Sequence, residues 1–280
     1  MEQSALQAAK EADLVVMPMG EHYLQSGEAT SRAMIDVPEI QMELFHKVLA
    51  VNPNVVVVLF NGRPLDLREI SAKAKAILEV WFPGTEGGSA VVDVLTGKKN
   101  PSGKLPMSFP YCVGQAPVSY NEYSTGRPNL PGMKERFRSK YLDIPNAPLY
   151  PFGYGLTYGK TEVTKAEMRD DGEHYTITAT GTKMRAVPCM SILQVYVRDN
   201  ESEFAVRNHS LCAFKAVSLG ANETCDVEIT VPKAALEIVD DTGTRRVDSR
   251  SFTFFIGTSQ PDDRSAELLG TRPVAVELKL

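Results

Sequence analysis

Apolar and polar positions follow one another in a regular order along the N-terminal part of the chain. Short apolar runs, some of them rich in β-branched residues, are each followed by a polar loop and then by apolar residues at helical spacing. The predicted strands span residues 14–19, 54–60, 76–81 and 104–109, and the predicted helices span residues 2–12, 38–51, 66–74 and 88–95. This order of strand, loop and helix predicts a parallel or mostly parallel sheet with helices on both faces.

Beyond residue 160 the pattern changes to short runs in which apolar and polar residues alternate. Turn signals such as Asp171-Gly172 and Thr242-Gly243 separate these runs. The predicted strands span residues 175–179, 192–197, 213–217, 225–231, 251–256 and 274–278. Short strands at this spacing predict an antiparallel β-sandwich, and we recognise no catalytic constellation within it.

The segment between the two patterns is rich in proline and aromatic residues. It is too aromatic for a disordered linker, so we expect an ordered strap laid across the neighbouring domains. The sequence therefore predicts an α/β domain at residues 1–112, a strap at residues 113–158 and a β-sandwich at residues 159–280.

Composition and charge narrow the classes of partner. The 280 residues are 43% hydrophobic and 23% charged, which is ordinary soluble composition. A net charge of -5 offers no basic surface, so we expect neither a nucleic acid nor an anionic membrane as a partner. No apolar run reaches the roughly 18 residues of a membrane helix. Residues 1–13 predict the start of an amphipathic helix rather than a signal peptide, and the compartment stays open.

The cysteine and histidine residues form no recognisable set of metal ligands. They are scattered singly along the sequence, at Cys112, Cys189, Cys212, Cys225, His22, His46, His174 and His209. Without a CxxC pattern or a Cys/His cluster we expect no metal and no cofactor. A GxSxG elbow, which would support a serine nucleophile, is also absent.

Polar, glycine-bearing loops follow three of the predicted strands. They span residues 20–32, 61–64 and 82–88. Because ligands of a parallel sheet bind at the carboxyl ends of its strands, these loops are where we expect a site. The first loop carries Glu21 and Glu28, and Glu28 is the candidate acid. Local sequence alone favours the plainer interpretation, in which both are solvated loop carboxylates.

Several longer motifs are more specific. They are NGRPL at residues 61–65, WFPGTEGG at 81–88, NPSGKLPMSFP at 100–110, TGRP at 125–128 and LYPFGYGLTY at 149–158. With these motifs the chain resembles the C-terminal part of family 3 glycoside hydrolases, and it is most similar to the bacterial periplasmic β-glucosidases of that family. The resemblance covers nearly the whole chain.

The resemblance implies an α/β sandwich domain, a strap and a fibronectin type III-like domain. In such enzymes an N-terminal barrel supplies a nucleophilic aspartate, and a loop of the α/β domain supplies the general acid/base. Glu28, in the segment SGEATSR, matches that acid/base position. Glu21 matches the family's Gly-Glu strand end, for which we expect a structural or loop-holding role.

The chain also departs from the family pattern. The barrel with its nucleophile is missing, and so is the usual first strand of the α/β domain, so we expect an incomplete α/β sandwich with an uncovered sheet edge. Such a fragment is expected to associate with a barrel-bearing chain or to form a homodimer. Without the barrel we expect Glu28 to be exposed.

Two functions follow from these observations. The first is the C-terminal portion of a retaining β-glucosidase-type hydrolase, acting on carbohydrate and catalytically incomplete by itself. The alternative is a non-catalytic carbohydrate-binding or assembly module. Arg32, Arg63 and Glu86 are the candidate substrate-binding residues, and in the binding module the loops at Glu28, Arg63 and Glu86 would hold the sugar.

Overall fold

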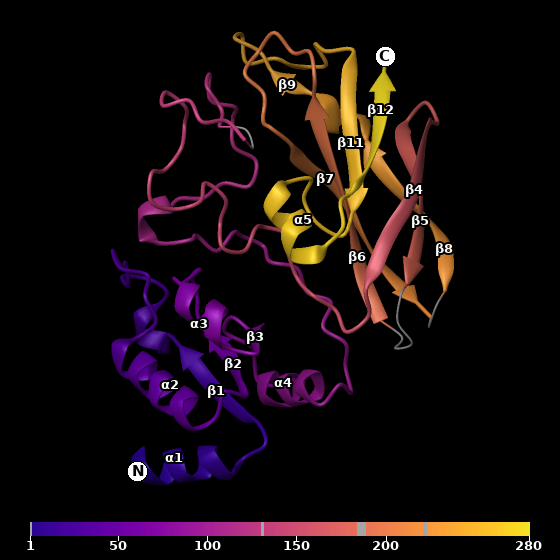
Figure 1. The fold of residues 1–280 in the computed structure, drawn as a ribbon. Helices are drawn as coiled ribbons and strands as arrows, with labels where there is room; N and C mark the ends of the chain where they lie inside the picture. Colours follow the sequence, from indigo (N-terminus) through magenta and orange to yellow (C-terminus); the bar gives the residue numbers. More distant parts are fainter. Residues whose placement is uncertain (1, 130–131, 184–188, 221–222) are drawn as a thin grey trace. The chain divides into compact units, whose positions relative to one another are not determined.

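The computed structural model describes residues 2–129, 132–183, 189–220 and 223–280 (Figure 1). The chain divides into two compact units. The first consists of Met1–Lys98 and Phe109–Val118, and the second of Lys99–Ser108 and Ser119–Leu280. Residues 113–118 group with the first unit and residues 119–158 with the second, so the strap is not a compact unit of its own.

The first unit is built on a parallel sheet with the strand order β1-β2-β3. Its strands are β1 (Val15–Gly20), β2 (Val55–Phe60) and β3 (Ala76–Glu79). Its helices are α1 (Glu2–Glu11), α2 (Glu39–Val51), α3 (Arg68–Lys73) and α4 (Gly87–Leu95), with short 3-10 turns η1 (Tyr23–Gln25) and η2 (Val113–Gln115). The central strand β2 is almost wholly buried, as its continuous apolar run predicts.

The sequence predicted these strands and helices with small errors at their ends, and the parallel arrangement is confirmed. The predicted strand at residues 104–109 is wrong. Leu105 pairs through both of its backbone groups, donating to the Tyr154 carbonyl (2.9 Å) and accepting from the Gly153 N–H (2.8 Å). Pro106 follows without an N–H group, so a regular ladder cannot continue.

The outer edge of β1 is uncovered among the described strands, but it offers few backbone groups for pairing. Odd-numbered residues turn their N–H groups toward β2, as Val15 and Glu21 show. Of the outward-facing residues, Pro18 has no N–H, and the Gln41 side-chain amide bonds both the N–H and the carbonyl of Gly20 (2.8 and 2.9 Å). A proline and an amide thus blunt this edge.

The apolar surface beside β1 is nevertheless open. Leu14 and Val16 are 52% and 41% exposed and line an apolar groove together with residues of α1 and α2. The uncovered sheet edge that we expected is therefore present, and apolar side chains are exposed beside it. No helix of the described residues is long and apolar enough to cross a membrane.

The second unit is an antiparallel β-sandwich with the strand orders β12-β11-β6-β7 and β4-β5-β8 (Figure 1). Its main strands are β4 (Thr161–Asp170), β5 (His174–Lys183), β6 (Cys189–Asp199), β7 (Ser210–Leu219), β8 (Thr224–Pro232), β11 (Ser251–Gly257) and β12 (Val274–Lys279). Smaller elements are η3 (Lys233–Leu236), β9 (Ile238–Val239), β10 (Arg245–Arg246) and α5 (Asp263–Leu269). All six predicted strands are confirmed, whereas β4 and α5 were not predicted.

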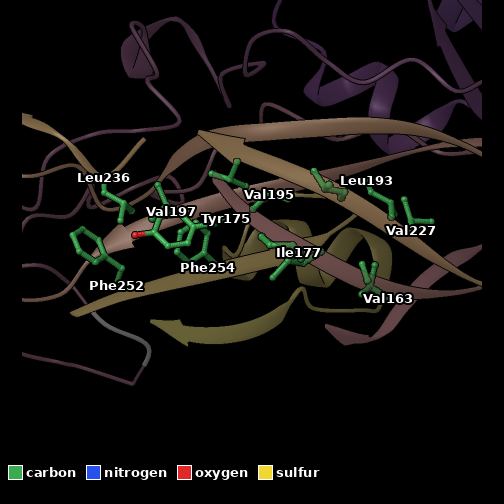
Figure 2. Close-up of a cluster of buried hydrophobic side chains, with 14 residues drawn as sticks. Val163, Tyr175, Ile177, Leu193, Val195, Val197, Val227, Leu236, Phe252 and Phe254 are labelled. Carbon is green, nitrogen blue, oxygen red and sulfur yellow. The ribbon is translucent and has the colours of Figure 1, made fainter. Parts of the chain in front are cut away.

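Alternate residues of the sandwich strands make its core. On β6 these are Leu193, Val195 and Val197, and on β11 they include Phe252 and Phe254. Figure 2 shows these side chains meeting those of the opposite sheet, such as Ile177 of β5 and Val227 of β8. The fibronectin type III-like arrangement therefore rests on the period-two pattern seen in the sequence.

Within the second unit, the aromatic motif at residues 149–158 is fastened to the sandwich by buried amides. Gln194 donates to the Gly153 carbonyl (2.9 Å) and accepts from the Tyr196 hydroxyl (2.6 Å). Gly153 has φ +77, and a Cβ atom there would lie 2.4 Å from the Gln194 Oε1 atom. Only glycine fits this contact, which explains one glycine of the FGYG sequence.

A second buried amide, Gln260, donates to the Phe152 carbonyl (2.8 Å) and accepts from the ring nitrogen of His209 (2.7 Å). Tyr120 stacks on Phe152 with ring centroids 4.0 Å apart. Burial lowers the pKa of His209, against smaller opposite influences of the Gln260 bond and of Asp262. The folded state therefore favours the neutral form of the His209 imidazole.

We predict that acid weakens this unit through His209. A depressed pKa means that the stabilisation is complete above the unfolded value of about 6.5 and is lost as pH falls through the folded value. Urea unfolding followed by circular dichroism at pH 7.5 and 5.5 should show a larger loss for the wild type than for His209→Phe. A His174→Gln control should behave like the wild type, and equal losses in all three proteins would contradict the prediction.

Candidate functional site

The three parallel strands bring polar residues together at their carboxyl ends. Glu21 follows β1 directly and donates its backbone N–H to the Phe60 carbonyl at the end of β2 (2.7 Å). Asn61 follows β2, and Glu79 ends β3. Residues that are far apart in the sequence thus share one edge of the sheet, where α/β proteins commonly place their chemistry.

Glu21 is the centre of this edge. Its side chain is fully buried and its Oε1 atom pairs with Arg32 Nη1 (2.9 Å) and Arg63 Nε (3.0 Å). Its Oε2 atom accepts from the Gly62 backbone N–H (3.2 Å). Two guanidinium groups therefore compensate one buried carboxylate, which would otherwise be costly to remove from water.

Both arginines also bind backbone carbonyls, Arg63 within the first loop and Arg32 shortly after it. Arg32 Nη2 donates to the Asp36 carbonyl (3.0 Å). Arg63 Nη2 donates to the carbonyls of Gln25 (2.7 Å) and Thr30 (2.9 Å). Arg63 therefore joins the two ends of the segment that contains Glu28, and Glu21 balances its charge.

Glu28 lies at the tip of that segment in a tight turn. Thr30 donates to the Gly27 carbonyl from its N–H (3.3 Å) and from its hydroxyl (2.6 Å). Ala29 has φ +58 and Gly27 has φ +118, so the turn uses backbone conformations that few residues adopt. The Glu28 side chain is exposed, as the sequence analysis expected.

The preceding 3-10 turn, η1, is capped at its N-terminal end by a reciprocal pair of hydrogen bonds. The His22 Nδ1 atom accepts from the Leu24 N–H (3.3 Å), and the Gln25 side chain accepts from the His22 N–H (2.8 Å). This capping box leaves the aromatic ring of Tyr23 and the carboxylate of Glu28 exposed on a braced loop.

The second loop approaches the first closely. A Cβ atom at Gly62 would lie 2.0 Å from the Ser26 Oγ atom and 2.9 Å from the Phe82 ring. Gly62 is therefore needed for the contact between the loops that follow β1, β2 and β3. Phe82 remains partly exposed at this contact.

The three predicted binding residues do not lie together in the structure. Arg32 and Arg63 are brought together on Glu21, and their contacts described above are to that carboxylate and to backbone carbonyls. Glu86 is apart from them, exposed at the start of α4 without a side-chain capping bond. A role for any of them in binding substrate stays a prediction. No group of three or more His, Cys, Asp or Glu side chains in the described part of the chain is placed to hold a metal ion.

The sequence analysis did not single out Asn61 and Glu79. Asn61 is fully buried and donates to the Arg63 carbonyl (2.7 Å), and Glu79 accepts from the Trp81 N–H (2.8 Å). Burial raises the pKa of Glu79 to about 7. The signal available in the sequence was a carboxylate inside the apolar run AILEVW.

Comparison with known proteins adds independent findings. The profile of the Glycosyl hydrolase family 3 C-terminal domain matches residues 1–158, and that of the Fibronectin type III-like domain matches residues 191–260. A Periplasmic beta-glucosidase of Salmonella typhimurium is 39% identical over 261 residues, which are 90% of this chain and 34% of that protein. A Beta-xylosidase of Formosa agariphila is 34% identical over 92% of this chain and 35% of its own length.

Solved structures agree with these relatives. The beta-glucosidase from Listeria innocua in complex with gluconolactone superposes with a TM-score of 0.90 at 36% identity. That match covers 99% of this chain and 38% of the Listeria protein. The chain thus spans roughly a third of the length of the proteins it matches.

We predict that the Glu21 carboxylate is the main stabiliser of this edge. Glu21→Gln leaves two partly buried guanidinium groups without an anion and should lower the free energy of unfolding of the first unit by about 3 kcal/mol, the lower end of the range for a buried pair. Trp81, the single tryptophan, lies in this unit and reports its urea unfolding by fluorescence. The control Glu28→Gln changes an exposed carboxylate and should stay within about 0.5 kcal/mol of wild type. Equal effects of the two substitutions would refute the assignment.

Proposed function

Because the chain belongs to glycosyl hydrolase family 3, we propose that it is the C-terminal portion of a retaining β-glucosidase-type hydrolase and that Glu28 is its general acid/base. The observation that carries the proposal is an exposed carboxylate on a braced loop at the carboxyl edge of a parallel sheet. Its position in the sequence matches the family's acid/base motif.

The proposed chemistry divides into two proton transfers. The Glu28 carboxyl gives its proton to the glycosidic oxygen while the bond from that oxygen to the anomeric carbon breaks and a nucleophile attacks the carbon. The resulting Glu28 carboxylate then takes a proton from a water molecule, whose oxygen displaces the nucleophile from the sugar. The exposure of Glu28 leaves room for a leaving group and for that water.

The nucleophile has to come from outside this site. A retaining enzyme needs a second carboxyl group about 5 to 5.5 Å from the acid, able to attack carbon. Glu21 is unsuited to that role because it is fully buried and paired with two arginines. We therefore propose that a barrel-bearing partner supplies the nucleophile and that the isolated chain is catalytically incomplete.

In this proposal Arg32 and Arg63 act on the loop rather than on the sugar. Their hydrogen bonds to Asp36, Gln25 and Thr30 support the assignment, because they fix the backbone on either side of Glu28. Glu86 is exposed and free of a capping bond, so it remains a candidate for contact with a sugar hydroxyl. The substrate class is a β-glucoside or a related carbohydrate.

A non-catalytic carbohydrate-binding or assembly module is the second candidate. The burial of Glu21 favours it, since this leaves Glu28 as the one carboxylate of the braced loop that is open to substrate. Calorimetric titration of the chain with cellobiose, beside an assay with an aryl β-glucoside, separates the two. Turnover by the pure chain that is abolished by Glu28→Gln would contradict both the second candidate and the incompleteness of the chain.

We predict that the role of Glu28 depends on the leaving group. In an active assembly of this chain with a barrel-bearing partner, Glu28→Gln should lower kcat/KM about 100- to 10,000-fold for a β-glucoside with an alkyl leaving group. The loss of kcat/KM should be far smaller for a dinitrophenyl β-glucoside, whose leaving group departs without a proton. Glu86→Gln is the matched control, with no such difference between substrates. An equal loss on both substrates for Glu28→Gln would assign it to binding instead.

A further inference from the structure

Two buried oxygen atoms at the edge of the sheet accept no hydrogen bond from any residue that the structure describes. They are Asn61 Oδ1, which follows β2, and Glu79 Oε2, at the end of β3. Neither is exposed to solvent, and buried polar atoms are nearly always paired. Two such atoms on neighbouring strands call for a common explanation.

The other polar atom of each side chain already has a hydrogen-bond partner. Asn61 Nδ2 donates to the Arg63 carbonyl (2.7 Å), and the Trp81 N–H occupies Glu79 Oε1 (2.8 Å). The Asn61 side chain lies close enough to Glu79 to influence the pKa of its carboxyl, which burial raises and Asn61 by itself lowers. An amide oxygen and an ionised carboxylate are both acceptors, so they need a proton between them.

We propose that Glu79 is a positioning residue that carries this proton, with its neutral carboxyl donating to Asn61 Oδ1. One proton then satisfies both buried oxygens and leaves the Trp81 contact in place. The carboxyl group thereby ties the end of β3 to the end of β2. The consequence of this link between the two strand ends for catalysis rests on the role proposed above for Glu28.

The electrostatic surroundings support a neutral Glu79. Burial is the largest influence and raises its pKa to about 7, while the Trp81 N–H and the Asn61 side chain act in the opposite direction. The charged groups at the neighbouring strand ends are Glu21, Arg32 and Arg63, and these are paired with one another. They leave the Glu79 carboxyl without a counter-ion among the described residues.

The proton on Glu79 matters because the Asn61 side chain holds the backbone carbonyl of Arg63. With Glu79 neutral, the Asn61 amide is free to point its N–H group at the Arg63 carbonyl. Ionised Glu79 repels Asn61 Oδ1 and competes for that N–H group. Arg63 in turn bonds Gln25 and Thr30 on either side of Glu28, so the proton on Glu79 sets how firmly the Glu28 loop is held.

The sign of the pH dependence follows directly. A carboxyl whose folded pKa is raised stabilises the fold fully below the unfolded value of about 4.3, and the contribution is lost as pH rises through the folded value near 7. The loop of residues 26–30 should therefore be held more firmly at pH 6 than at pH 8.

Trp81 provides the test, since it is the single tryptophan and its backbone N–H donates to Glu79. We expect the Trp81 fluorescence of the wild-type chain to titrate with a midpoint near pH 7. In Glu79→Gln the side-chain amide can donate to Asn61 at every pH, so the midpoint should vanish. The control Glu86→Gln should keep it. A midpoint that persists in Glu79→Gln, or a flat wild-type titration between pH 5.5 and 8.5, would overturn the proposal.

Two further measurements make the result independent of that variant. Carbon-13 NMR of wild-type chain labelled at the glutamate carboxyls should show one resonance titrating near pH 7, and its absence would overturn the proposal even when Glu79→Gln does not fold. Hydrogen-exchange protection of residues 26–30, measured relative to residues 55–60, should fall from pH 6 to pH 8 in the wild type alone. None of these readouts uses hydrolysis, so their outcome is separate from the outcome for Glu28.

Discussion

One buried carboxylate, Glu21, organises the edge of the sheet on which the proposed chemistry depends. It lies directly after a strand whose backbone is fixed by β2, and it collects two guanidinium groups and one backbone N–H. Each arginine extends from this anion to carbonyl groups of the loop that bears Glu28. The position of the exposed Glu28 thus depends on the buried side chain of Glu21.

Glu21 and Glu28 have different roles for a simple physical reason. A carboxylate enclosed by cations is a good anchor, because its ion pairs are short and shielded from water. The same enclosure keeps substrate away from the carboxylate, so it can neither pass a proton to a sugar nor attack one. An exposed carboxylate on a tight turn has the opposite properties, and the chain places one of each within eight residues of sequence.

Much of the fold could be predicted from patterns of apolar residues. Strand β2 is a continuous apolar run and strand β11 begins with alternating apolar and polar residues, and both strands were located from the sequence. The strand at residues 104–109 was wrongly predicted because apolar residues there are separated by Pro106, and β4 was missed because charged residues interrupt its alternation. The short α5 depends on Asp262 as a capping residue and on Gly270 in a left-handed conformation, signals too local to be recognised by periodicity.

The site was predictable only in part. Motifs identified Glu28 and the family, whereas the pairing of Arg32 and Arg63 with Glu21 joins residues up to 42 positions apart and requires the sheet to bring strand ends together. For Asn61 and Glu79 the sequence offers only a carboxylate inside an apolar run, because their importance arises from burial and from one oxygen atom of each that has no described donor. Such features are properties of the folded edge and not of any single segment.

The central claim is that the Glu21 cluster holds the loop that presents Glu28. Hydrogen exchange of the backbone amides of residues 26–30, compared between the wild type and Glu21→Gln under conditions where both are folded, tests it most directly. The account predicts that these amides lose protection in Glu21→Gln while those of β2 keep theirs. Unchanged protection of the loop would show that Glu28 is held by something else.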